Sequence, residues 1–148
     1  MDYSVSTDTA ATMGQAWAAM SAVTNLPQWT KSMISVTPLD AATLKVGHRF
    51  RIKQPGLPPT TWQVSEVREG ESFTWEATAP GLRSVAYHRL SRNADGSTRI
   101  VIGVVQTGVL SALMGLLGAT KTRRFLAMEA AGLKAAAEAA PPISGKAL

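Results

Sequence analysis

The sequence contains no cysteine among its 148 residues and only two histidines, His48 and His88. The missing cysteines exclude disulfide bonds, thiol nucleophiles and cysteine metal ligands, and they suit a cytoplasmic protein. The two histidines are forty residues apart, and no carboxylate clearly faces inward beside either, so we predict no metal site. Because neither GxGxxG nor a GxxxxGK phosphate loop occurs, we also predict no nucleotide cofactor.

The sequence also lacks an apolar run of membrane-spanning length. The run at residues 109–119 is shorter than the roughly 20 residues that such a helix requires. The first residues, MDYSVSTDTAATMG, have neither the basic start nor the apolar core of a secretion signal. With 45% hydrophobic and 17% charged residues, the composition is typical of a globular domain. We therefore expect a cytoplasmic protein without a membrane span.

Positive charge is in excess, with a net charge of +5 and an isoelectric point near 10.0. Such a balance raises the question of nucleic-acid binding. The cations are scattered, however, between an alternating segment at 49–53 and a later helix at 121–124, and no compact basic run with interleaved aromatics occurs. We therefore expect a solvated basic surface and no nucleic-acid partner.

Apolar periodicity divides the chain into a strand, two short helices, six further strands and one long helix. The expected segments are a strand at 3–7, a helix capped by Asp8 or Thr9, a short helix at 23–29, strands at 32–39, 48–54, 61–68, 72–78, 83–91 and 97–107, and a helix at about 109–139. Turn residues lie close together between the strands, which favours hairpins. The predicted fold class is α+β, with a seven-stranded antiparallel sheet covered on one face by the C-terminal helix. Residues 1–140 are predicted to form one domain, and 141–148 a flexible tail.

Alternation assigns one face of each strand to the interior. In the segment at 48–54 the basic side chains share one face, which must be the solvated one. The inward set is then Phe50, Ile52, Gln54, Trp62, Val64, Phe73, Trp75, Ala77, Ile100, Ile102, Val104 and Gln106. For the strand at 83–91 the alternatives are Ser84, Ala86, His88 and Leu90 or Val85 and Tyr87. We take the set with His88 as inward, and its small side chains leave space.

The long helix carries a cation on its expected buried stripe. At 100° per residue, the stripe contains Leu110, Met114, Leu117, Lys121, Phe125 and Met128, with Arg124 at its edge. A buried ammonium requires a partner or water, which argues against a dry, fully packed core beneath this helix. Two placements of Lys121 stay open. Its ammonium either reaches the rim while its stem packs on the sheet, or projects into a wet or ligand-filled cavity.

The order of elements resembles the helix-grip fold of the START and birch-pollen-allergen superfamily (SRPBCC), and specifically its polyketide cyclase/dehydrase and lipid-transport-like branch. The resemblance is carried by residues Asn25–Val36, Lys45–Val67, Ser72–Gly81, His88–Leu90 and Asp95–Ile102. It implies two short helices after the first strand and a sheet that curls around the long helix to enclose an apolar cavity. The segment QPGLPPTTW would be a turn at the cavity mouth, where Leu57 could act as a gate.

We therefore expect this protein to bind a hydrophobic or aromatic small molecule, lipid-like or polyketide-like, between the sheet and the C-terminal helix. The predicted ligand-binding residues are Trp29, Phe50, Ile52, Gln54, Leu57, Trp62, Phe73, Trp75, Tyr87, Gln106, Met114, Leu117, Lys121, Arg124 and Met128. An enzyme is the alternative, a polyketide cyclase or dehydratase with His88 as catalytic acid or base. A third possibility is an interaction module that contacts a partner through Pro55–Pro59. The oligomeric state stays open between monomer and homodimer.

Overall fold

The computed structural model describes residues 1–139, so the predicted tail at 141–148 lies outside the described residues. Its elements are β1 (Asp2–Thr9), α1 (Met13–Ser21), the 3-10 helix η1 (Val23–Asn25), α2 (Leu26–Trp29), β2 (Ser35–Pro38), β3 (Arg49–Lys53), β4 (Thr60–Arg68), β5 (Ser72–Ala79), β6 (Leu82–Arg92), β7 (Thr98–Thr107) and α3 (Ser111–Ala139). The predicted order of elements and the α+β class are confirmed.

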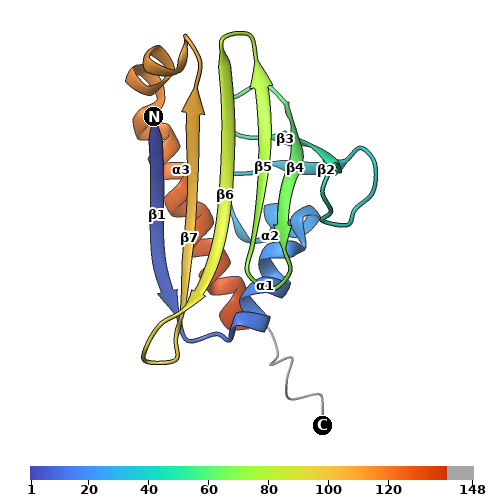
Figure 1. Cartoon of the computed structure of the whole chain (residues 1–148), viewed down its shortest axis with the longest axis vertical. Coiled ribbons are helices and arrows are strands. Elements are labelled where there is room, and N and C mark those ends of the chain that lie inside the picture. Colours follow the sequence, from blue (N-terminus) through green and yellow to red (C-terminus); the bar gives the residue numbers. More distant parts are fainter. Residues whose placement is uncertain (140–148) are drawn as a thin grey trace.

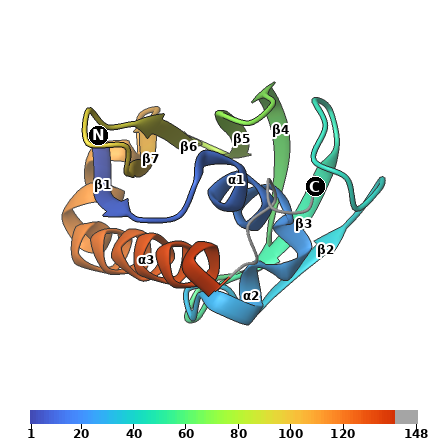
Figure 2. The ribbon, with the colours of Figure 1, turned by 90° about the horizontal axis from the view of Figure 1, so that it is seen from below.

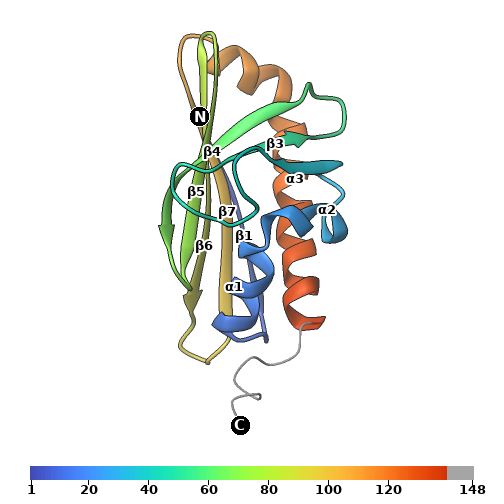
Figure 3. The same ribbon diagram turned by 90° about the vertical axis from the view of Figure 1, so that its right-hand side faces the viewer.

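The seven strands form one antiparallel sheet in the order β1-β7-β6-β5-β4-β3-β2. Strand β1 thus pairs with the last strand, while the others pair with their neighbours in sequence (Figure 1). The sheet curves, and the helices lie on its concave side (Figures 2 and 3). A register shift between Val64 and Glu66 interrupts the β4–β5 pairing. Such a bulge bends a strand and adds to the curvature.

Local sequence signals account for the start of both short α-helices, with one correction. Helix α1 is capped by Thr12, whose side chain accepts from the Gln15 amide while the Gln15 side chain accepts from the Thr12 amide. The predicted caps, Asp8 and Thr9, are wrong because β1 continues through Thr9 in register with β7. In α2, Pro27 lies in the first turn, where its missing N–H is harmless.

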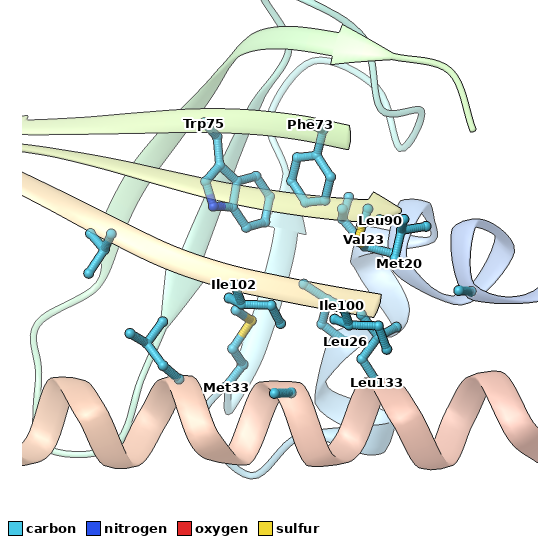
Figure 4. Close-up of a cluster of buried hydrophobic side chains, with 14 of the residues drawn as sticks. Met20, Val23, Leu26, Met33, Phe73, Trp75, Leu90, Ile100, Ile102 and Leu133 are labelled. Carbon is cyan, nitrogen blue, oxygen red and sulfur yellow. The ribbon is translucent and has the colours of Figure 1, made fainter. Parts of the chain in front are cut away.

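The packed core lies where α1, η1, α2 and the C-terminal half of α3 meet the sheet (Figure 4). Its most completely buried side chains include Met20, Val23, Phe73, Trp75, Ile100, Ile102 and Leu133. Gly132 allows α3 to approach α2 closely, since a Cβ at this position would lie 2.0 Å from the Trp29 carbonyl oxygen. The C-terminal half of α3 is therefore held tightly by its neighbours.

The buried stripe of α3 differs from the predicted one. The buried residues are Gly115, Phe125, Leu126, Glu129, Ala130, Leu133 and Ala137. By contrast, Leu117 is 74% exposed and Met128 is only partly buried. Apolar residues occur on every side of the helix before Thr120, so periodicity alone could not identify the buried face there. Packing against β1, β7 and α1 decides it. Within residues 1–139, none of the helices combines the length and apolar character that crossing a bilayer requires.

Candidate functional site

A cavity of about 340 Å³ lies between the concave face of the sheet and α3. It begins at the N-terminal half of the helix and ends at Glu129. Strands β3 to β7 supply its walls and α3 supplies its remaining side. The lining residues are Met33, Ile52, Gln54, Leu57, Pro58, Thr60, Trp62, Trp75, Ala77, Thr78, Ala79, Leu82, Ser84, Ala86, His88, Ile102, Gly103, Val104, Gln106, Met114, Gly118, Lys121, Thr122, Phe125, Leu126 and Glu129.

The cavity walls are mainly apolar, and one tryptophan is held at their centre. Trp75 is buried in an aromatic cluster, with ring centroids 6.1 Å from Trp62, 6.0 Å from Phe50 and 5.1 Å from Phe73. Its cross-strand neighbour on β6 is Ala86, whose small side chain occupies little of the space in front of it. The small side chain of Ala86 beside the bulky Trp75 leaves the cavity open. This agrees with the predicted inward face of this strand, which contains His88 and small side chains.

The segment from Gln54 to Pro58 lies at the edge of the cavity, with Leu57 and Pro58 in the lining. Lys121 contacts this segment, since its Nζ donates to the Pro55 carbonyl oxygen over 3.4 Å. A Cβ at Gly56 would lie 2.5 Å from the same Nζ, so glycine provides room for the ammonium. Of the two placements left open, this hydrogen bond corresponds to the rim, with the stem of Lys121 lining the cavity.

The deepest polar groups of the cavity are His88 of β6 and Glu129 of α3. Their exposed fractions are only 5% and 7%, and His88 Nε2 lies 3.9 Å from Glu129 Oε1. The imidazole stacks on the Phe73 ring, with centroids 4.1 Å apart and planes inclined by 6°. It also meets the Trp75 ring edge-on at 5.7 Å. These contacts fix the orientation of the imidazole.

Burial shifts the pKa values of both groups toward their neutral forms. Desolvation lowers the pKa of His88 from 6.5 to about 4, although a hydrogen bond with the Phe73 carbonyl partly opposes this. Desolvation also raises the pKa of Glu129 from 4.5 to about 8. At neutral pH the pair therefore consists of a neutral imidazole and a carboxylic acid, and it carries one titratable proton in all.

Glu129 lines the cavity beside His88 but is absent from the predicted set, because no inward carboxylate was expected there. The spacing of Glu129 from apolar residues of the helix could have indicated that it faces inward. Glu129 lies four residues after Phe125 and four before Leu133, on the stripe that these two apolar residues share. The predicted stripe through Leu117 and Met128 placed Glu129 beyond its edge.

Nine of the residues predicted for the site line the cavity together: Ile52, Gln54, Leu57, Trp62, Trp75, His88, Gln106, Met114 and Lys121. Seven do not: Trp29, Phe50, Phe73, Tyr87, Leu117, Arg124 and Met128. These seven lie outside the cavity lining, and ligand binding by any of the sixteen stays a prediction.

The reasons for these seven exclusions differ. Phe50 and Phe73 are buried in the core beside Trp75. Tyr87 lies on the other face of β6, where its hydroxyl donates to Asp2. Trp29 packs under Gly132.

The other three excluded residues belong to α3, and the different position of the buried stripe accounts for them. Leu117 and Arg124 are exposed, and Met128 lies at the margin of the buried stripe. Among the residues that the structure describes, His, Asp and Glu side chains form no group of three that could hold a metal ion.

A curved antiparallel sheet that closes over a long C-terminal helix, with two short helices after its first strand, is the helix-grip fold. The family model described as polyketide cyclase / dehydrase and lipid transport matches residues 1–138. The chain belongs to this family, as the resemblance predicted. No curated protein matches the chain significantly in sequence.

Solved structures share the fold at low sequence identity. A hypothetical protein of Helicobacter pylori is 15% identical with a TM-score of 0.75, over 90% of this chain and 84% of that one. A protein of Thermus thermophilus is 12% identical with a TM-score of 0.74, over 94% and 98%. Norcoclaurine synthase from Thalictrum flavum is 12% identical with a TM-score of 0.74, over 95% and 87%. At these identities the likeness concerns the fold alone.

Proposed function

We propose that this protein binds a mainly apolar small molecule, lipid-like or aromatic, in the cavity between the sheet and α3. The cavity itself carries the proposal. Its volume of about 340 Å³ falls within the range of roughly 300–1,000 Å³ usual for ligand pockets. Burial of the ligand's apolar surface would drive binding. A cytoplasmic location is part of the same proposal, because the sequence carries no cysteine.

The distribution of polar groups supports this function. Apolar side chains such as Trp75, Ile102 and Leu126 form most of the lining, and the few polar groups lie in separate places. Lys121 lies at the rim, whereas the imidazole and carboxyl groups lie in the interior. A side-chain-filled interior would have favoured an interaction module that uses the Pro55–Pro59 segment, and this cavity is open.

The first test is native mass spectrometry of the protein purified from cells, with identification of any extracted molecule, and titration with naphthalene as an apolar probe. We expect a co-purified apolar molecule or saturable naphthalene binding. Ala86→Phe, which places a ring in the cavity, should abolish both. The matched control is Val85→Phe, on the opposite face of β6, which should leave both unchanged. An empty protein that also ignores naphthalene would overturn the proposal and favour a protein partner.

One observation favours a second candidate, a cyclase or dehydratase, because an acid and a base face the same cavity. In a dehydration, His88 Nε2 would remove a proton from carbon while Glu129 protonates the departing hydroxyl, which leaves as water. Transfer of the proton from imidazolium to carboxylate would then restore the pair. A bell-shaped pH–rate profile is expected, and His88→Gln should abolish turnover while binding persists. Turnover that survives His88→Gln would exclude this role.

A further inference from the structure

The interior pair is too widely spaced to be satisfied by its own contact. His88 Nε2 and Glu129 Oε1 are 3.9 Å apart, beyond hydrogen-bond distance. Both residues are almost fully buried and both line the cavity. Within residues 1–139 the Glu129 carboxyl makes no hydrogen bond to another residue. The two groups face the cavity, and a gap of this size between polar atoms is commonly bridged by a third polar atom.

The proton positions of the pair follow from its neighbours. His88 Nδ1 lies 3.3 Å from the Phe73 carbonyl oxygen, which can only accept a hydrogen bond. The neutral imidazole therefore carries its proton on Nδ1, and Nε2 presents a lone pair. Burial keeps Glu129 protonated at neutral pH, so its carboxyl has an O–H to donate. The charged group nearest to them in the lining, Lys121, is turned to the Pro55 carbonyl at the rim.

We propose that His88 and Glu129 together bind a hydroxyl group of the ligand, a phenol or an alcohol, with its oxygen between Nε2 and the carboxylic acid. The hydroxyl donates to Nε2 and accepts from Glu129, so all three groups are satisfied at once. A ketone or ether oxygen can accept from Glu129 but leaves Nε2 unpaired. A carboxylate has no proton for Nε2. This inference rests on the proposed function and adds the chemical class of the ligand.

A second polar pair defines the other end of the ligand. Gln106 Nε2 donates to Ser84 Oγ over 3.4 Å, and both residues line the cavity. Ser84 lies four residues before His88 on β6, roughly 13 Å away at about 3.3 Å per residue. The wall between them is formed by Trp75, Ala86 and Val104. The ligand class is therefore a flat or slender apolar body with a hydroxyl at one end, and a second polar group fits at the other.

The test compares 2-naphthol with naphthalene and 2-methoxynaphthalene by calorimetric titration of the wild-type protein near pH 6. The hydroxyl should tighten binding about tenfold over naphthalene, as two net hydrogen bonds imply, and by a smaller factor over 2-methoxynaphthalene, whose ether oxygen can still accept from Glu129. Glu129→Leu and His88→Phe should each reduce this preference, because each removes one of the two partners of the hydroxyl. Glu129→Gln, which keeps a donor at the same place, should retain most of the preference.

The possible results test the hydroxyl assignment separately from the proposed function. Equal affinities of the three probes for the wild-type protein overturn the hydroxyl assignment and leave the proposed function standing. A preference for 2-naphthol that survives undiminished in both Glu129→Leu and His88→Phe also overturns it, because the hydroxyl is then bound elsewhere. If none of the probes binds, the proposed function fails and this inference with it. The wild-type comparison requires no variant to fold.

Discussion

At the scale of single residues, the polar pair in the cavity carries the proposed recognition of a hydroxyl group. His88 is positioned by stacking on Phe73 and by its contact with the Phe73 carbonyl, while Glu129 is brought to it by the helix on the other side of the cavity. Neither group is exposed enough to be ionised cheaply. Their shifted pKa values are therefore also statements about stability.

The pair should leave a characteristic pH dependence of stability. Between about pH 4.5 and 6.5 the folded and unfolded states each hold one proton on these two groups, so their contribution is flat. Between about pH 6.5 and 8 only the folded state holds a proton, so the free energy of unfolding should fall by roughly 1.4 kcal/mol per pH unit, about 2 kcal/mol in all. Urea unfolding at pH 5.5, 6.5 and 8 measures this.

The control for this prediction is Glu129→Gln, which cannot lose a proton. Subtraction of its stability curve from that of the wild type removes the titration of surface groups. The difference should fall with rising pH over the window from 6.5 to 8. A flat or rising difference there would show that the folded pair holds no proton in this window, with Glu129 ionised beside a neutral His88.

At the scale of elements, α3 has two halves with different environments. Its C-terminal half packs against α1 and α2 and is held closely where Gly132 meets Trp29. Its N-terminal half borders the cavity, and Leu113, Leu116 and Leu117 are exposed there. Helix propensity treats the glycines of both halves alike, as weak points. The glycines of the two halves differ in how closely other residues approach them.

Replacement of glycine by alanine should therefore change the free energy of unfolding in opposite directions in the two halves of α3. Gly132→Ala introduces a Cβ that meets the Trp29 backbone at 2.0 Å, and we expect a loss of about 1–3 kcal/mol in the free energy of unfolding. Gly118→Ala meets nothing within 4 Å and should gain up to about 1 kcal/mol from helix propensity. Thermal and urea unfolding of both variants decide this. A stabilised Gly132→Ala variant would contradict the close approach of α3 to α2.

At the scale of the whole molecule, the fold combines a packed region and an open one. The short helices and the C-terminal half of α3 close one part of the concave face (Figures 3 and 4). The cavity occupies another part of that face. A ligand would replace the missing core of the open part. Local stability should therefore differ between the two parts and respond differently to binding.

Hydrogen exchange measures that difference directly. Without ligand, peptides from residues 111–122 should exchange faster than peptides from 125–137, because fewer of their side chains are buried. Saturation with 2-naphthol at 100 times its Kd should slow exchange in 111–122 by up to about 100-fold, with little change in 125–137. Ala86→Phe should show no probe-dependent protection. Protection that persists in Ala86→Phe would place the probe outside the cavity.

The sequence alone was sufficient to predict the elements, the antiparallel sheet and the inward face of β6. These follow from short-range rules, since side chains alternate along a strand and turn residues mark hairpins. The inward side chains of His88 and Trp75 could be assigned in this way. The resemblance to the helix-grip family predicted the cavity, and nine of the predicted residues line it.

The tertiary structure alone decided which face of α3 is buried, and with it the presence of Glu129 beside His88. Apolar residues surround the first half of that helix, so no periodicity marks its contact face, and the rotation of the helix is set by distant partners in β1, β7 and α1. A contact between residues 88 and 129 depends on the curvature of the whole sheet. The chemistry of the site comes from that contact, because desolvation of both groups arises only when the sheet and the helix enclose them.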